Sequence, residues 1–153
     1  MKMGIPKPLR EEHAELHRDL GALIKSGGQV GRAARRVAER LHPHFVKEEK
    51  LAMPPLGLLR PMMAGKGTVK AGEVMDLMER LAAQIPAMFR EHRQIVGALQ
   101  GLASAGRKER NGAARRFAQR LLLHARIEED VLYPASLLVG EYLKTLMEMN
   151  ARR

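Results

Sequence analysis

The sequence predicts an all-α protein, an up-down-up-down four-helix bundle with a short additional C-terminal helix. Three observations lead to this fold class. The helix-forming residues Ala, Leu, Arg, Glu and Met dominate the 153-residue chain, and only 3% of residues are aromatic. Proline and glycine divide the chain into long runs, in which apolar residues recur with the three-and-four spacing of amphipathic helices. The links are short, and short links make sequential helices antiparallel.

Five helical runs are expected between the proline and glycine positions. Their approximate limits are residues 9–25, 29–53, 73–104, 107–133 and 136–150. A mixed segment from Leu56 to Gly72 follows the second run, and it is expected either to cover the bundle end as a lid or to pack on the bundle. Residues 105–106 are expected to break the third run, and Pro134 to end the fourth. The chain length predicts one domain, residues 1–153, with the bundle over about 9–134.

Each of the four longer runs carries a stripe that steps alternately by three and four residues. In chain order the stripes are Leu9, His13, Leu16, Leu20 and Leu23; Val37, Leu41, His44, Glu48 and Leu51; Leu81, Ile85, Met88, His92, Ile95, Leu99 and Leu102; and Phe117, Leu121, His124, Glu128 and Val131. Such stripes face neighbouring helices packed lengthwise. The four stripes should therefore meet in one core.

Polar residues of two kinds interrupt all four stripes. They are His13, His44, Glu48, His92, His124 and Glu128. An isolated ionisable group in a core costs several kcal/mol unless it is paired or ligated. In both His-x-x-x-Glu motifs the two side chains lie one helical turn apart on the same face. These six residues are predicted to ligate metal at one shared site; the alternative is a metal-free bundle in which they satisfy one another.

The two halves of the chain repeat each other. Residues 33–41 align with residues 113–121 at an offset of 80, which also pairs the two His-x-x-x-Glu motifs and Pro54 with Pro134. Glu12-His13 aligns with Glu91-His92 at an offset of 79. Each half is thus a hairpin with one lone histidine and one His-x-x-x-Glu motif, so each ligand set is expected to be completed within its own hairpin. Two equivalent sets predict two metal ions.

With these motifs the chain resembles the hemerythrin-like family, often called the HHE cation-binding domain. The motifs that carry the resemblance are Glu12-His13, His44 to Glu49, Glu91-His92 and His124 to Glu129, and they span about residues 9–134. Histidine with carboxylate suits a non-haem di-iron centre, with manganese and zinc as competitors. The resemblance implies that Glu48 and Glu128 bridge two iron ions, that the four histidines are terminal ligands, and that water, oxo or hydroxo completes the centre.

The oxygen-carrying hemerythrins have a fifth histidine in the third helix, four residues from the first. Met88 and Val96 occupy those places here, and neither is a suitable ligand. The departure argues against a reversible oxygen carrier and for a more open site. His17 is either a fifth histidine ligand or a partly exposed flanking residue. Glu49 and Glu129 adjoin the predicted ligands and are expected at the surface.

The expected role is to bind or sense O2, NO or peroxide, or to handle iron. A di-iron enzyme that reduces peroxide or O2 is an alternative, although no catalytic residue is assigned and a non-enzymatic role is favoured. The net charge of +10 raises a further alternative, a nucleic-acid-associated module with a structural metal. Against it, the chain has no recognisable nucleic-acid-binding motif and few aromatic residues for stacking. The basic residues are expected to form a solvated face.

Composition sets further limits on the protein class. The chain has no cysteine, which excludes disulfides, thiolate metal sites, iron–sulfur clusters and a cysteine nucleophile. No run is apolar over the 18 or so residues of a membrane helix, and residues 1–6 lack a signal-peptide core, so a cytoplasmic protein is expected. The C-terminal run has Leu138, Tyr142, Thr145 and Met149 on one face, which either covers the bundle or forms a homodimer contact.

Overall fold

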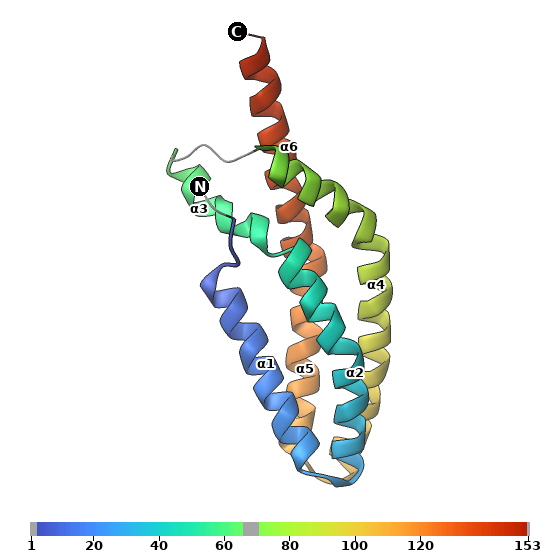
Figure 1. Ribbon diagram of the computed structural model, residues 1–153. Helices are drawn as coiled ribbons and strands as arrows, with labels where there is room; N and C mark the ends of the chain where they lie inside the picture. The colour runs from blue at the N-terminus through green and yellow to red at the C-terminus, as the bar shows by residue number, and fades with distance from the viewer. Residues whose placement is uncertain (1–2, 66–70, 153) are drawn as a thin grey trace.

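The computed structural model describes residues 3–65 and 71–152, and every regular element within them is helical. The bundle consists of α1 (Lys7–Lys25), α2 (Gly28–Leu51), α4 (Ala71–Lys108) and α5 (Gly112–Ile127). These helices run alternately down and up, and the packing of α1 on α2, α2 on α4, α4 on α5 and α5 on α1 closes the ring (Figure 1). The predicted all-α four-helix bundle is confirmed.

The two turns at one end of the bundle fix where the helices begin. Gly27 and Gly28 both have positive φ, 70° and 62°, a backbone region that favours glycine. Glu109 accepts hydrogen bonds from the backbone N–H groups of Gln29 (2.6 Å) and Val30 (3.2 Å), and so caps α2 from the other turn. Asn111 caps α5 by accepting from the N–H of Ala114 at 3.0 Å.

The predicted helix break at residues 105–106 is wrong, because α4 continues to Lys108. Ala105 is buried in the core. At Gly106 an added Cβ would lie 3.0 Å from the Cβ of Ala114, so this glycine permits α5 to approach α4 closely. Tertiary packing therefore outweighs the local preference of Ala-Gly for a helix end.

Two apolar clusters fill the bundle, one on each side of a polar layer. The cluster near the α1–α2 turn includes Leu20, Val37, Leu99 and Phe117. The cluster toward the other end includes Leu51, Leu58, Val74, Leu81 and Tyr133. Along each bundle helix the predicted ligands lie at or beside the junction of the two clusters. The polar layer is therefore enclosed by apolar packing above and below.

The end of the fourth run differs from the prediction. Residues Glu128–Leu132 form a π-helical turn, η2, and α6 (Tyr133–Ala151) follows directly with Pro134 in its first turn. A π-helical turn has more residues than an α-helical turn, so the inward positions shift. Val131, predicted on the stripe, is 55% exposed, and Tyr133 is buried instead. Pro134 begins a helix here rather than ending one.

The C-terminal helix α6 is present and projects beyond the bundle (Figure 1). Its packed face is not the one considered from the sequence, because Leu138 and Tyr142 are exposed while Val139 and Leu143 are buried. Gly140 allows the close contact with α4, since an added Cβ would lie 2.3 Å from the Met78 side chain. Within residues 3–65 and 71–152, no helix is long and apolar enough to cross a membrane.

The mixed segment after α2 forms η1 (Pro54–Leu58) and α3 (Leu59–Met63) at the end of the bundle opposite the turns (Figure 1). Leu58 is fully buried in the core, as the packing alternative predicts. Leu59 and Met63, at 38% and 88% exposed, do not pack there. Residues 66–70 of this segment lie outside the described residues.

Candidate metal centre

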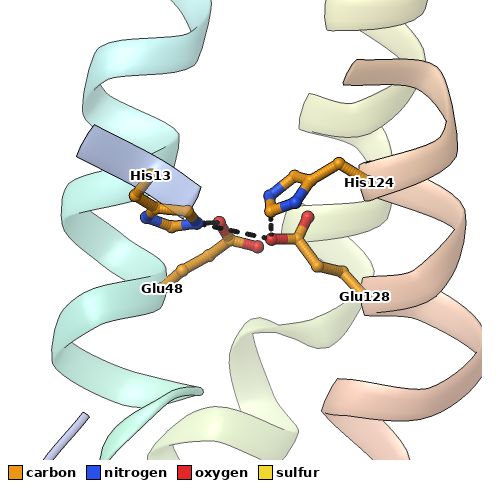
Figure 2. A group of neighbouring side chains, drawn as sticks. All are labelled: His13, Glu48, His124 and Glu128. Atoms are coloured by element: carbon orange, nitrogen blue, oxygen red, sulfur yellow. Dashed lines mark ion pairs between the residues drawn. The ribbon is translucent and has the colours of Figure 1, made fainter. Parts of the chain in front are cut away.

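The structure brings the six sequence-predicted ligands together in the polar layer, and all six are buried. They form two overlapping groups. We call these groups the first position (His13, Glu48, His124 and Glu128) and the second position (His44, Glu48, His92 and Glu128). Within each group every residue offers one nitrogen or oxygen donor atom, and these four atoms all lie within 4.8 Å of one another. Figure 2 shows the four side chains of the first position turned toward one another.

The pairing of the histidines differs from the expectation that each hairpin completes its own set. His13 from α1 joins His124 from α5, and His44 from α2 joins His92 from α4. Each position therefore takes one histidine from each half of the chain. The closed ring permits this pairing, because α1 packs on α5 and α2 packs on α4 in addition to the contacts within each hairpin.

Both glutamates extend across the two positions, with one carboxylate oxygen toward each. Oε2 of Glu48 lies 3.7 Å from His13 Nε2 in the first position, and its Oε1 lies 3.2 Å from His44 Nε2 in the second. Oε1 of Glu128 lies 2.6 Å from His124 Nε2 in the first position, and its Oε2 lies 3.3 Å from His92 Nε2 in the second. This is the arrangement that two bridging carboxylates require.

Several donor atoms of the centre are buried without a hydrogen-bond partner. They are Nε2 of His13, Nε2 of His124, Oε2 of Glu48 and both carboxylate oxygens of Glu128. Such atoms cost free energy in a protein interior unless something else satisfies them. Imidazole nitrogen and carboxylate oxygen together are a ligand set for iron, zinc and manganese. The residues present therefore fit bound metal.

A second carboxylate stands behind each histidine ring. The Nδ1–Oε distances are 3.0 Å for His13–Glu49, 2.7 Å for His44–Glu91, 2.7 Å for His92–Glu129 and 3.4 Å for His124–Glu12. In the hydrogen bonds of His13, His44 and His92, a protonated Nδ1 donates to the carboxylate, which leaves the Nε2 lone pair facing the centre. The prediction that Glu49 and Glu129 are mere surface groups is wrong. They are half-buried, and each contacts the histidine of the neighbouring helix.

The two central carboxylates have opposite electrostatic environments. Burial raises the pKa of Glu48, and the adjacent charge of Glu128 raises it further. Burial alone would also raise the pKa of Glu128, but the imidazoles of His124, His13 and His92 that face its carboxylate outweigh burial and lower that pKa well below its usual range. Without metal, Glu128 is therefore the carboxylate that the histidines hold ionised.

The histidines of the two motifs show the complementary effect. Burial lowers the pKa of His44, but its contacts with Glu48 and Glu91 prevail and raise the pKa to about 9. Burial also lowers the pKa of His124, but the contact with Glu128 prevails and raises that pKa above its usual value. The metal-free centre is thus held together by buried histidine–carboxylate ion pairs.

Sequence reasoning missed Tyr133. Its hydroxyl donates a hydrogen bond to Oε1 of Glu48 and lies 3.2 Å from Nε2 of His92, within the second position. Burial and the carboxylates of Glu48 and Glu128 raise its pKa, so the phenol is protonated in the metal-free protein. The sequence contained one signal for it. The repeat aligns Tyr133-Pro134 with Met53-Pro54, so Tyr133 is the position at which a polar side chain replaces an apolar one.

His17 lies outside both positions. Its ring contacts the rings of His42 and Phe45 edge-on, with centroids 5.4 and 5.2 Å apart. Phe45 in turn stacks on His13 at 3.7 Å with an interplanar angle of 7°. In this arrangement His17 has the flanking, partly exposed place that was the alternative to ligation.

Comparison with protein families gives one assignment. The model of the hemerythrin HHE cation binding domain matches residues 5–136, which is most of the chain. The chain belongs to this family. Searches of curated proteins and of solved structures found no match. Membership in the hemerythrin HHE family and the buried His/Glu groups both indicate that the protein binds metal cations.

Proposed function

We propose that this hemerythrin-like protein holds two iron ions in the polar layer and uses them to bind or sense a small ligand, O2, NO or peroxide. The observation that carries the proposal is the placement of the two glutamates. Each presents one oxygen to the first position and one to the second. A single ion would leave half of these buried oxygens and two imidazole nitrogens without a partner.

The ligand count favours a centre that accepts a further molecule. Each position offers two imidazole nitrogens and two carboxylate oxygens. Iron in such sites takes up to six ligands, so coordination positions stay free for water, a bridging oxygen or a small ligand. Bound iron would supply redox activity and affinity for diatomic molecules, while the protein supplies the enclosed ligand set.

The surroundings favour a small ligand over a bulky one. Apolar clusters enclose the polar layer on both sides. All six candidate ligands are buried within this packing. A centre enclosed in this way favours molecules as small as O2, NO or peroxide over an organic substrate.

The direct test is a metal inventory combined with a visible spectrum. Protein purified without added metal should contain about two irons per chain. Air admitted to the reduced protein should produce a visible absorption band that is absent from the spectrum of the protein oxidised with ferricyanide. A stable band supports binding or sensing, and rapid bleaching with consumption of peroxide would instead indicate an enzyme. One zinc per chain, or no metal, would contradict the di-iron proposal.

Two variants test the bridging assignment. Glu48→Ala and Glu128→Ala should each lose both irons, because each glutamate contacts both positions. Glu148→Ala removes an exposed glutamate on α6 and is the matched control, which should retain full metal content. Metal binding that survives unchanged in either central variant would show that the glutamates do not bridge.

A further inference from the structure

The repeat that builds the two positions is broken at Tyr133. The offset of 80 residues aligns Tyr133 with Met53, and both side chains are 2% exposed. The histidines and central glutamates are the same in both halves. A buried phenol on one side only makes the two positions chemically different, and the difference lies inside the centre.

The Tyr133 hydroxyl stands where a ligand of the second position would stand. It contacts Oε1 of Glu48 and lies 3.2 Å from Nε2 of His92. That nitrogen is itself 2.8 Å from Nε2 of His44. Donor atoms at roughly 2.0–2.2 Å from one ion are about 3 Å apart when they occupy adjacent places around it. The distances from His92 Nε2 to the phenol oxygen and to His44 Nε2 both agree with this spacing.

Packing fixes the phenol in this place. The Tyr133 ring lies nearly parallel to the His92 ring, with centroids 5.8 Å apart and an interplanar angle of 16°, and it also stacks against Phe89. The hydroxyl of Ser136, one turn later in α6, donates to the backbone carbonyl of Ala52. This bond ties the start of α6 to the end of α2. The extra residue in the π-helical turn η2 brings Tyr133 to the inner face.

We propose that Tyr133 is a fifth protein ligand of the metal ion at the second position, bound through its phenol oxygen. The inference rests on the proposed metal centre but not on the identity of its small ligand. A bond forms between Oη and the ion, and the phenol proton leaves to solvent. The second ion is then more fully coordinated than the first. Free coordination places are concentrated on the ion held by His13 and His124.

The amino-acid composition makes this proposal easy to test. The chain has two tyrosines and no tryptophan, and Tyr142, the other tyrosine, is 51% exposed on α6. The 153-residue chain is loaded with two equivalents of ferrous iron and oxidised with ferricyanide. Its visible spectrum should show a tyrosinate-to-iron charge-transfer band, and excitation in that band should enhance tyrosine ring vibrations in the resonance Raman spectrum.

Two variants assign the signal to one residue. Tyr142→Phe leaves Tyr133 as the only tyrosine without touching the centre, and it should keep the band at full intensity. Tyr133→Phe retains the ring and its stacking but should lose the band completely. The Tyr142→Phe protein decides the question even if the Tyr133→Phe protein does not fold.

The possible failures are distinguishable by metal analysis. A wild-type chain that binds two irons but shows no tyrosinate band overturns the ligand proposal alone. A band that persists in Tyr133→Phe, or disappears in Tyr142→Phe, also overturns it. A chain that takes up no metal overturns this proposal and the proposed function together.

Discussion

The first and second positions are built on the same His-x-x-x-Glu plan but differ in their surroundings. In the first position, Phe45 stacks on His13. The residue that aligns with Phe45 in the second half of the sequence repeat is the small residue Ala125. In the second position, Lys47 forms an ion pair with Glu91. The residue that aligns with Lys47 in the second half of the sequence repeat is the apolar residue Ile127. The ligating residues are retained in both halves, and the residues around them are not.

The contacts between the histidine rings and the outer carboxylates follow the same division. Both histidines of the second position have an Nδ1–carboxylate distance of 2.7 Å, to Glu91 and Glu129. The distances in the first position are 3.0 Å for His13 and 3.4 Å for His124. The second position is therefore the more tightly held, polar side of the centre. The first position is bordered by the Phe45 ring, and the carboxylates behind its histidines lie farther from Nδ1.

Among the variants that distinguish the two positions, Phe45→Ala is expected to have the largest effect on stability and metal binding. Phe45 is 1% exposed, and truncation of a buried phenylalanine costs about 3–5 kcal/mol of unfolding free energy. The variant also removes the ring stacked on His13, so metal occupancy should fall more at the first position than at the second. Urea unfolding of the metal-free protein and a metal titration measure the two effects.

Phe117→Ala provides the control for Phe45→Ala. Phe117 is buried in the apolar cluster near the turns and makes no ring contact with the centre among the described residues. It should lose a similar amount of stability and keep both metal equivalents. Equal metal binding by the two variants would show that Phe45 contributes only to packing and that the aromatic border of the first position has no effect on the ligands.

The helices and the six candidate ligands could be predicted because they follow one periodicity. His13, His44, His92 and His124 are at stripe positions of α-helices, so their burial follows from residue spacing alone. Their meeting in one layer follows from the phase of the four stripes, whose polar positions coincide when the helices pack side by side.

The residues that sequence reasoning misplaced depend on features outside that periodicity. Tyr133 is buried only because a π-helical turn changes the register after Glu128, and this change also exposes Val131. Glu49 and Glu129 lie at the edge of their helices, so their role depends on the histidine of a neighbouring helix. The spacing of residues along one helix does not contain that information.

The ion pairs of the second position predict a pH effect in the metal-free protein. The pKa of His44 is raised in the folded state to about 9, from 6.5 when unperturbed. Folding therefore favours its protonated form. The resulting stability is fully present below pH 6.5 and is lost as the pH rises through about 9. The shift corresponds to about 3 kcal/mol of unfolding free energy.

Urea unfolding in the presence of a chelator, between pH 6 and pH 10, measures this effect. The matched variant is His44→Gln, which lacks the titrating ring. The difference in stability between the two proteins should shrink as the pH increases across this range. A difference that does not change with pH would show that His44 is not held as an imidazolium and that the second position is not the more strongly ion-paired side.

The smallest of these effects is expected from the outer carboxylates, and it tests the comparison most directly. Replacing a carboxylate behind a ligating histidine typically lowers metal affinity by about 10–100-fold. Glu129→Gln removes the charge at 2.7 Å from His92 and should reach this range. Glu12→Gln acts across 3.4 Å on His124 and should lower affinity by less than 10-fold. Competition with a chromophoric chelator measures both; equal losses would mean that the two positions are supported alike despite their different contacts.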